Sequence, residues 1–370
     1  MSSLPAFNFS AIPDYGIPAR NASAPFSLLL HGQLSIRRQM SATAQIASTK
    51  PPNADILFAT AQNDVPARAR ASHLVSRIGG KRLRYALFSA GGRPRRGTVV
   101  ILQGRNECIE KYYETIGDLS RRGLGTAIMD WRGQGGSERL IRDREKGYVS
   151  SYDDYVADLD QFFEEIILPD CVGPFYVLAH SMGGLIALLA APRLVNRVQR
   201  MVLSTPLLVF QGLPLSMPAL SRVSALLCGV GLGATYLGGG PRARNTTLFA
   251  GNKLTSDYAR FTRNSGIYLR HPQLALGGPT AAWIRASCAA AAAVLEPEHR
   301  ARIQVPTLII AAGADEVVST PAIEAFGTRL KSGSVLTIDG ARHELLQEAD
   351  VYREQFMAAF DAFVPGTGDD

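Results

Sequence analysis

The chain has 370 residues, of which 46% are hydrophobic, 39 are Lys or Arg and 32 are Asp or Glu. This length and apolar content suffice for a large buried core, which excludes a fibrous or wholly disordered chain. The formal net charge is +7, but the basic residues are spread along the chain, so we expect a solvated basic surface and no nucleic-acid partner. The four cysteines at 108, 171, 228 and 288 are widely separated, which excludes a dense disulfide framework and favours a reducing, cytoplasmic location.

Residues 1–54 differ in composition from the rest of the chain. They are rich in Ser, Ala and Pro, and Asp14 is the only acidic residue before Asp55. The apolar run at 26–30 is too short for the core of a secretory signal and follows no strong basic cluster. We therefore predict a disordered N-terminal tail, with the alternative that translation starts at Met40 and removes most of it.

From residue 55 onward, apolar runs typical of buried strands alternate with helical patterns. Apolar residues at helical spacing predict helices over 152–163 and 351–360. Two strands that follow each other closely indicate an antiparallel pair, and later strands separated by helices indicate parallel units. These features predict an α/β protein with a mostly parallel eight-stranded sheet covered by helices on both faces. The predicted strands are 73–78, 83–89, 98–103, 125–130, 174–179, 199–204, 306–312 and 333–338.

The most informative segment is an apolar strand that ends abruptly at Ser181. Ala179 and Gly183 stand two residues before and after this serine, and both are small enough for a sharp strand-to-helix turn. Glycine is usual at both positions, so Ala179 adds one methyl group to the turn. The helix that follows would direct the positive end of its dipole toward the serine. Ser181 is therefore the candidate nucleophile, with an ordinary helix N-cap as the alternative.

A serine in such a turn needs an acid and then a histidine later in the chain. Asp315 and His343 each follow a predicted strand in the second half, where the carboxyl ends of parallel strands gather a site. Among the other acids, Glu316 should point away from Asp315, Asp339 could hold the histidine loop through an Asx turn, and Asp130 is expected to fix the loop after its own strand. The remaining histidines lie in the turn itself, before the sheet core or in a probable insertion. We therefore predict Asp315 as the orienting acid and His343 as the general base.

A serine that attacks a carbonyl group also needs two backbone N–H groups that bind the developing oxyanion. Met182, directly after the candidate nucleophile, supplies the first, and Arg105 is predicted to supply the second because Gly104 lets the backbone turn after the strand 98–103. The side chain of Arg105 has two possible roles. It could pair with Glu107 as part of the scaffold, which we favour, or face an anionic group of the substrate.

The alternation of strands and helices stops between 208 and 298, which predicts an inserted cap over the site. Its apolar runs are interrupted by Gly and Pro well short of the roughly 20 residues that a membrane-spanning helix needs. Such a lining would suit an acyl chain, since burial of each methylene contributes about 0.8 kcal/mol. Peripheral contact with a membrane through the cap is a hypothesis, and packing of the cap onto the core is the alternative. Four arginines could meet a phosphate headgroup, although scattered arginines more often solvate a face: Arg242, Arg244, Arg260 and Arg263.

Taken together, these motifs resemble the α/β-hydrolase group of monoacylglycerol lipases and lysophospholipases, especially members similar to lysophospholipase L2. The likeness covers about 55–364 and rests on five motifs in the order of the family: 103–107 before a Lys-Tyr-Tyr helix, 130–137, the turn at Ser181, 313–315 and 340–343. The predicted domains are thus a hydrolase core over 55–207 and 299–364, the cap over 208–298, and tails over 1–54 and 365–370.

The resemblance implies hydrolysis of a carboxylic ester in a lipid with one acyl chain, such as a lysophospholipid or a monoacylglycerol. It implies no metal ion and no organic cofactor. Separately, we expect a cytoplasmic location, with peripheral contact at the inner face of the membrane as a hypothesis. A short-chain carboxylesterase and an acyltransferase are alternatives, because the same triad serves all three reactions. A binding protein that keeps the fold without the activity is a further alternative. The sequence leaves the headgroup, the acyl-chain length and the oligomeric state open.

Overall fold

The structure is a computed structural model that describes residues 56–91, 96–241 and 248–365. The predicted tail over 1–54 lies outside the described residues, as do residues 366–370 of the predicted C-terminal tail. Arg242 and Arg244, two of the four candidate headgroup ligands, also lie outside them.

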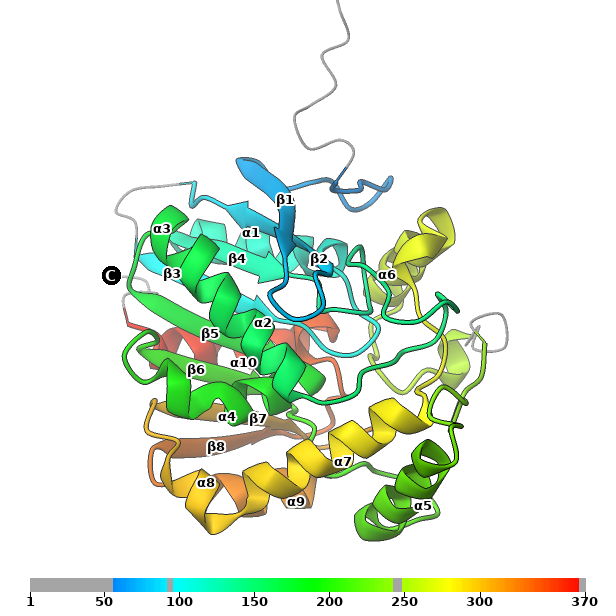
Figure 1. Cartoon of the computed structure of the whole chain (residues 1–370). Coiled ribbons are helices and arrows are strands. Elements are labelled where there is room, and N and C mark those ends of the chain that lie inside the picture. The colour runs from blue at the N-terminus through cyan, green and yellow to red at the C-terminus, as the bar shows by residue number, and fades with distance from the viewer. Residues whose placement is uncertain (1–55, 92–95, 242–247, 366–370) are drawn as a thin grey trace, which may run out of the picture. The chain divides into compact units, whose positions relative to one another are not determined.

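Eight strands form one mixed sheet in the order β1-β2-β4-β3-β5-β6-β7-β8 (Figure 1). β2 is antiparallel to both β1 and β4, and the other neighbouring strands are parallel. The predicted α/β class and mostly parallel eight-stranded sheet are therefore confirmed. The strands are β1 (Ala69–Val75), β2 (Arg82–Phe88), β3 (Gly97–Leu102), β4 (Leu124–Met129), β5 (Phe175–His180), β6 (Arg200–Ser204), β7 (Thr307–Ala312) and β8 (Gly333–Ile338).

The predicted boundaries hold to within one residue for every strand except the first, which was predicted over 73–78 and runs from Ala69 to Val75. The chain turns directly after β1, where the N–H of Ser76 donates to the carbonyl of Lys81 at 2.8 Å. Gly79 and Gly80 in this turn have φ of 70° and 61°, which glycine adopts readily. The start of β1 has few apolar side chains, so the pattern misses it, although it pairs with the end of β2.

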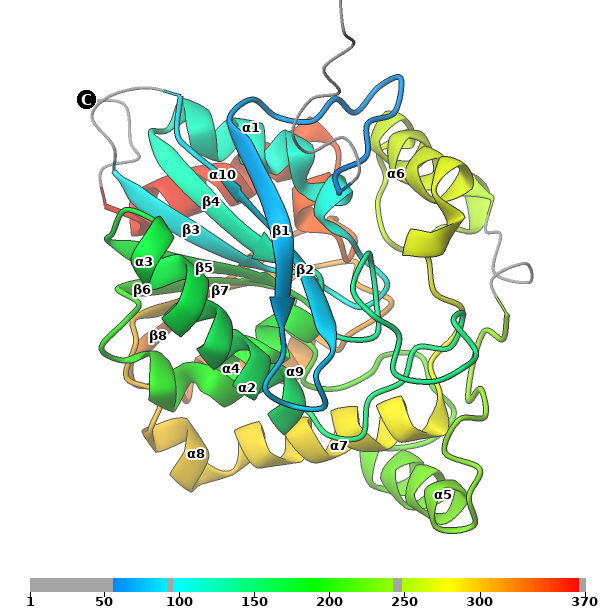
Figure 2. The same ribbon diagram turned by 45° about the horizontal axis from the view of Figure 1, so that its top comes forward.

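Helices cover both faces of the sheet, as predicted (Figures 1 and 2). One buried cluster joins the sheet to α2 (Asp153–Phe162), α4 (Met182–Leu194) and α9 (Thr320–Gly327). A second cluster joins the opposite face to α1 (Tyr113–Arg121) and α10 (Asp350–Phe363). Successive side chains of a strand point to opposite faces, and on β3 Val100 enters the first cluster whereas Val99 and Ile101 enter the second. The central strands are therefore buried on both sides, as their continuous apolar runs predict, whereas the edge strands β1 and β8 are partly exposed.

Between β6 and β7, the described residues form four α-helices and add no strand to the sheet. They are α5 (Met217–Gly229), α6 (Tyr258–Arg270), α7 (Ala281–Leu295) and α8 (Pro297–Ala301). The helix α7 contacts both α4 of the core and α5, and its N-terminal N–H groups are capped by Thr280, whose hydroxyl accepts from the N–H of Trp283. The cap boundaries at 208 and 298 stay a prediction. Among the described residues, no helix combines the length and the apolar character needed to cross a membrane.

Candidate active site

The turn at Ser181 has the strained geometry that its small neighbours predict. Ser181 has φ of 52° and ψ of −114°, a conformation that L-residues rarely adopt, and it lies directly between β5 and α4. A Cβ atom on Gly183 would lie 2.1 Å from the carbonyl oxygen of Leu102 on β3, so only glycine fits there. Ala179 is fully buried, and its additional methyl group is accommodated. The turn thus holds the serine at the carboxyl end of the sheet.

Ser181, His343 and Asp315 form one chain of hydrogen bonds. The hydroxyl Oγ of Ser181 lies 3.0 Å from Nε2 of His343, and Nδ1 of His343 lies 2.7 Å from Oδ2 of Asp315. Because the carboxylate can only accept, Nδ1 carries the proton, and Nε2 is left to accept from the serine hydroxyl. All three side chains are buried, so these contacts are shielded from bulk water.

The pKa of Asp315 is set by two opposing effects. Burial raises it, but the hydrogen bond from His343 and those from the backbone N–H groups of Val317 and Val318 outweigh burial and hold it below its ordinary value. The carboxyl group is therefore ionised at neutral pH. An ionised Asp315 keeps the imidazole in the tautomer described above and would stabilise an imidazolium.

The competing acids have other partners. Glu316 forms an exposed ion pair with Lys253 at 3.0 Å. Asp339 is exposed after β8, whereas Asp130 is buried and accepts from Arg84 at 2.7 Å and from the N–H of Gly136 at 2.6 Å. The prediction that Asp130 fixes the loop after its own strand is therefore confirmed.

The remaining described histidines do not contact Ser181 through their side chains. His271 stacks on Phe58 with ring centroids 4.5 Å apart, and Nε2 of His299 is 3.0 Å from the carbonyl of Leu188. His180 precedes the serine, with its ring centroid 4.8 Å from that of His343. Burial lowers the pKa of His180 to about 3, so it stays neutral and adds no charge beside His343 at neutral pH.

Met182 and Arg105 both line the cavity at Ser181, and the backbone N–H of each has no acceptor among the described residues. The first opens α4, where the leading N–H groups of a helix have no internal partner and carry its positive dipole. The second belongs to the loop after β3, held by the hydrogen bond from the N–H of Gly104 to Oε2 of Glu107 at 2.5 Å. This placement is what an oxyanion hole requires, and the assignment of both groups stays a prediction.

We favoured a scaffold role in which the Arg105 side chain pairs with Glu107, and the predicted partner was wrong. Glu107 does not pair with Arg105, because its carboxylate accepts from Lys111 at 2.7 Å and from Tyr112 at 2.6 Å. The guanidinium of Arg105 instead donates to the carbonyl of Gly277 at 2.5 Å and lies 5.2 Å from the centroid of Trp283. Sequence reasoning chose Glu107 because it is near in the chain, whereas the true partners are far away in sequence.

A buried charge cluster behind His343 was not predicted. Nζ of Lys111 donates to Glu107 at 2.7 Å and to Glu344 at 2.6 Å, and both carboxylates are buried. Burial alone would raise the pKa of Glu107, but Lys111 outweighs it and lowers that pKa to about 2. Carboxylates of this cluster and His180 lie close enough together to ligate a metal ion. Lys111 already supplies the cation between the two carboxylates, and we interpret the cluster as an internal ion-pair network.

A cavity of about 540 Å³ opens at Ser181 and His343. This volume is within the range of about 300–1,000 Å³ that is usual for sites of small ligands. Most of its lining is apolar and comes from the loop after β6, from α5 and the segment that follows it, and from α7; these residues include Leu207, Phe210, Leu213, Leu215, Leu220, Val223, Leu237, Trp283 and Ile284. An apolar wall beside a nucleophile suits the hydrocarbon part of a substrate.

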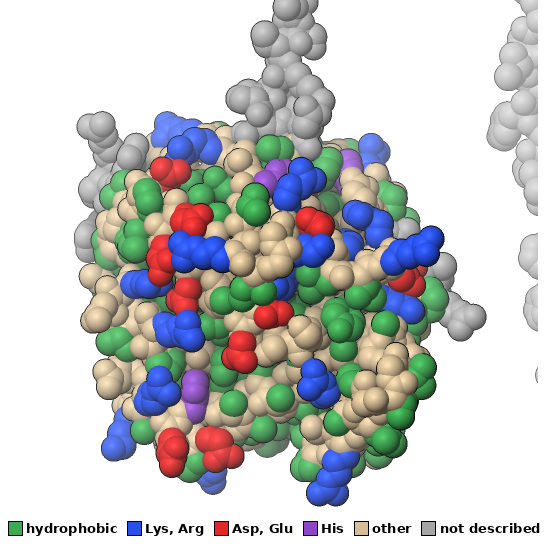
Figure 3. All heavy atoms as spheres, in the orientation of Figure 1, with side chains coloured by type: hydrophobic (Ala, Val, Ile, Leu, Met, Phe, Trp, Pro, Cys, Tyr) green, Lys and Arg blue, Asp and Glu red, His purple; other side chains and the backbone are tan. Residues whose placement is uncertain are grey.

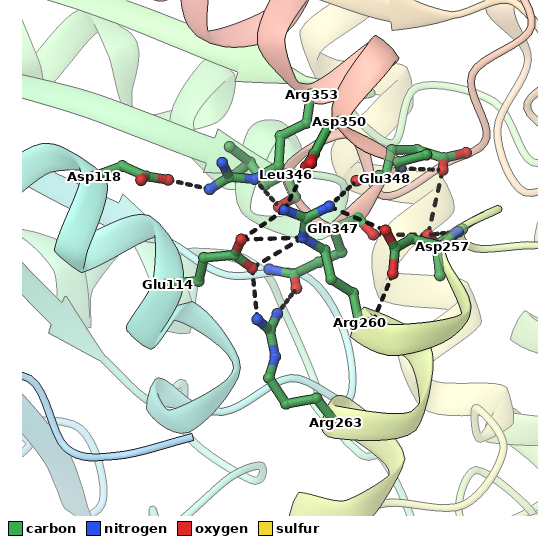
Figure 4. Close-up of polar contacts among 12 residues, drawn as sticks. Glu114, Asp118, Asp257, Arg260, Arg263, Leu346, Gln347, Glu348, Asp350 and Arg353 are labelled. Carbon is green, nitrogen blue, oxygen red and sulfur yellow. Dashed lines mark hydrogen bonds and ion pairs between the residues drawn. The ribbon is translucent and has the colours of Figure 1, made fainter. Parts of the chain in front are cut away.

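Arg260 and Arg263, the two candidate headgroup arginines that the structure describes, are already engaged in ion pairs between α6 and the core (Figure 4). Arg260 donates to Glu114 on α1 at 2.7 Å and to Asp350 at the start of α10 at 2.7 Å. Arg263 donates to the other oxygen of Glu114 at 2.5 Å. These arginines therefore attach α6 to the core, and neither the headgroup role nor the solvated-face alternative describes them.

The sheet, the nucleophile turn and the order of Ser181, Asp315 and His343 along the chain define an α/β-hydrolase. A family model described as serine aminopeptidase S33 matches residues 93–350, and the chain belongs to this family. Lysophospholipase L2 of Escherichia coli (strain K12) is 32% identical over 298 residues, which cover 76% of this chain and 83% of the relative. The resemblance stated from the motifs is therefore confirmed.

Solved structures show the same fold at lower identity. The monoacylglycerol lipase of Paleococcus ferrophilus is 21% identical, with a TM-score of 0.61, and the match covers 77% of this chain and 99% of that one. A thermostable carboxyl esterase from Bacillus coagulans is 18% identical, with a TM-score of 0.64 over 81% of this chain and 99% of that one. Both are similar to this chain in architecture.

Proposed function

We propose that this protein hydrolyses the carboxylic ester of a lipid with a single acyl chain, with Ser181 as the nucleophile. The observation that carries the proposal is the continuous hydrogen-bond chain from Ser181 Oγ through His343 to Asp315, with distances of 3.0 and 2.7 Å. A structural serine would not need a histidine with a fixed tautomer and a buried carboxylate behind it.

In this mechanism, His343 removes the hydroxyl proton as Ser181 attacks the ester carbonyl. The carbonyl oxygen becomes an oxyanion, which accepts from the N–H groups of Met182 and Arg105. The tetrahedral intermediate collapses to an acyl-enzyme, and His343 gives its proton to the leaving alcohol. Water then attacks the acyl group with His343 again as base, and the fatty acid is released.

Within the ester lipids, we favour a lysophospholipid over a monoacylglycerol. The relative with the stronger sequence similarity is named lysophospholipase L2, whereas the likeness to a monoacylglycerol lipase supports the fold only. The apolar cavity supports an acyl substrate in both cases, since each buried methylene favours binding by about 0.8 kcal/mol. A short-chain esterase would gain little from that wall.

We further propose that the protein works in the cytoplasm and touches a lipid surface at the mouth of this cavity. Leu213, Leu215 and Val223 line the cavity and are also exposed, at 47%, 43% and 40%. Leu226 of α5 is 69% exposed beside them. An apolar rim at the entrance would let a lipid pass from a micelle or a bilayer into the site without crossing water. On the face shown in Figure 3, acidic and basic side chains are interspersed. We therefore propose no nucleic-acid partner for this face.

Hydrolysis assays with purified protein test this proposal. The substrates are lysophosphatidylcholine and monoacylglycerol with the same acyl chain, and a short p-nitrophenyl ester. We expect fatty-acid release from the lysophospholipid, and a loss of about 10⁴-fold or more in Ser181→Ala. Ser204→Ala is the matched control, because Ser204 is also buried at a strand end and its hydroxyl has no partner among the described residues. Activity on the short ester alone would contradict the lipid class, and full activity of Ser181→Ala would contradict the nucleophile.

A further inference from the structure

The wall of the cavity contains two side chains with a permanent positive charge among the described residues, Lys111 and Arg105. The ammonium group of Lys111 lies between the carboxylates of Glu107 and Glu344, so these three side chains together carry one formal negative charge in excess. Arg105 has no acidic partner in the described part of the chain. Arg105 is therefore the cation of the described cavity wall that has no ion-pair partner.

Several contacts fix the guanidinium of Arg105 in place. Nη2 donates to the carbonyl of Gly277, and the group lies over the ring of Trp283. A Cβ atom on Gly147 would lie 2.7 Å from Nη2, so the glycine leaves room for the guanidinium. The adjacent Asn106 accepts from the N–H of Leu276 at 2.6 Å, which ties the same loop to the segment before α7. The cation is thus held rigidly before any ligand binds.

These contacts leave donors of the guanidinium unused. Nε is buried and has no partner, and Nη1 makes no hydrogen bond to a described residue and is not sealed from solvent. Burial lowers the pKa of Arg105 to about 10, so the group is still charged at neutral pH. Burial of a cation with unused hydrogen-bond donors costs free energy unless an anion binds to those donors. Arg105 lines the catalytic cavity and also a second small pocket that shares Trp283 with it, so the fold maintains this cost next to the site.

We propose that Arg105 binds the phosphate group of a lysophospholipid whose ester lies at Ser181, an inference that rests on the proposed function. The backbone N–H of Arg105 is assigned to the oxyanion, and its side chain extends from that point to the guanidinium. In a lysophospholipid, the glycerol unit likewise separates the ester carbonyl from the phosphate by a few bonds. One residue would therefore contact the substrate at both ends of the glycerol, and the planar guanidinium can donate two hydrogen bonds to phosphate oxygens.

The engagement of the other arginines near the cap supports this assignment. Arg260 and Arg263 both form ion pairs with Glu114, so their charges are already paired and are not available to a headgroup (Figure 4). A monoacylglycerol has no phosphate and leaves Arg105 without a partner. Arg105 therefore discriminates between the two lipid classes, because its cation stays unpaired when a monoacylglycerol is bound.

The test compares two esters that differ in the phosphate group. Wild type, Arg105→Met and Arg105→Lys are assayed with lysophosphatidylglycerol and with 1-monoacylglycerol of the same acyl chain, in the same mixed micelles. The readout is the ratio of kcat/KM for the two esters, so any general damage to the oxyanion loop cancels. Arg285→Met is the matched control, because Arg285 also donates to one backbone carbonyl and has a buried, unpartnered Nε but does not line the cavity.

We expect Arg105→Met to lower the ratio by about 10- to 100-fold, Arg105→Lys to lower it less, and Arg285→Met to leave it unchanged. The ratio would stay unchanged if Arg105→Met lost activity equally on both esters, which would show a purely structural role, or lost none on either, which would show no role. Either result overturns the inference alone. A wild-type protein that hydrolyses neither ester would overturn the proposed function together with the inference.

Discussion

The geometry of Ser181 depends on close contacts that leave no room for a larger neighbour. Its N–H donates to the carbonyl of Ser204 at 3.0 Å, and its own carbonyl accepts from the N–H groups of Leu185 and Leu207 at 3.1 and 3.0 Å. These bonds come from two segments, α4 and the end of β6 with the residues that follow it, and they hold a positive φ that a serine would not adopt by itself. The strain places the hydroxyl at the imidazole of His343 rather than in the core.

Gly183→Ala tests how tight this turn is. The new methyl carbon would lie 2.1 Å from the carbonyl oxygen of Leu102, so β3 or α4 must shift. We expect a loss of about 3 kcal/mol or more in the free energy of unfolding, with a large loss of activity. Gly266→Ala in α6 is the control, because nothing lies within 4 Å of its added methyl carbon. It should raise stability by up to about 1 kcal/mol through helix propensity. Denaturant unfolding measures both, and equal stability of the two variants would contradict the contact.

Asp315→Asn tests the assignment of the acid. An amide in place of the carboxylate can donate to Nδ1 of His343 and so favours the wrong tautomer, and it does not stabilise an imidazolium. We expect kcat to fall by about 10³- to 10⁴-fold while the fold is kept. Asp339→Asn changes the exposed competitor nearby and should retain activity. If the two variants lose activity equally, Asp315 is not the orienting acid.

At the scale of elements, α6 is attached to the core through charge rather than through a large apolar face. Asn264 and Ile267 are its buried residues, and Glu114 of α1 accepts from two of its arginines (Figure 4). Burial alone would raise the pKa of Glu114, but the hydrogen bonds from Arg260 and Arg263 outweigh burial and lower the pKa from 4.5 to about 2. Ionised Glu114 therefore stabilises the folded state above pH 4.5, and this contribution is lost as pH falls from 4.5 to about 2.

Glu114→Gln should remove that pH-dependent contribution. We expect the variant to be less stable than wild type by about 1–2 kcal/mol at pH 7, and the difference to shrink as pH falls from 4.5 to about 2. Glu164→Gln is the control, because Glu164 pairs with arginines at an exposed site and should change stability little. Thermal unfolding across this pH range measures the effect. A difference that is constant with pH would contradict the assigned ion pairs.

The helix α5 has exposed apolar side chains, and we propose that it contacts the lipid surface. Leu226→Ser should weaken binding to phospholipid vesicles about three- to tenfold, because an apolar side chain that enters a bilayer contributes on the order of 1 kcal/mol. Val351→Ser on α10 is the control, since Val351 is 63% exposed but lies on a helix of the core. Vesicle sedimentation measures both variants. Equal binding of wild type and Leu226→Ser would contradict contact through α5.

At the scale of the whole molecule, the sheet brings together residues that are far apart in sequence. Arg105, Ser181, Asp315 and His343 each follow the carboxyl end of a parallel strand, so the strand order places them at one edge. This is why the sheet could be predicted from the alternation of elements, and why site candidates could be chosen from their places after strands. The turn at Ser181 could be predicted because it needs particular small residues at fixed spacing.

The contacts that could not be predicted join segments without a fixed spacing. Gly277 is 172 residues from Arg105, and Glu114 is 146 residues from Arg260. No periodic pattern in the sequence shows which acidic side chain pairs with which basic one, because the same sequence is compatible with many different ion pairs. The start of β1 was missed for a related reason, since its pairing with β2 rather than its own apolar content makes it a strand. Long-range side-chain partners therefore required the folded chain.

The most direct measurement of the central claim is to locate the acyl group during turnover. Wild-type protein is mixed with a lysophospholipid, quenched in acid within milliseconds, digested and mapped by mass spectrometry. The account predicts that the peptide containing Ser181 gains the mass of the acyl group and that Ser181→Ala gains none and releases no fatty acid. Fatty-acid release at the wild-type rate by Ser181→Ala, or an acyl group on another residue, would contradict it.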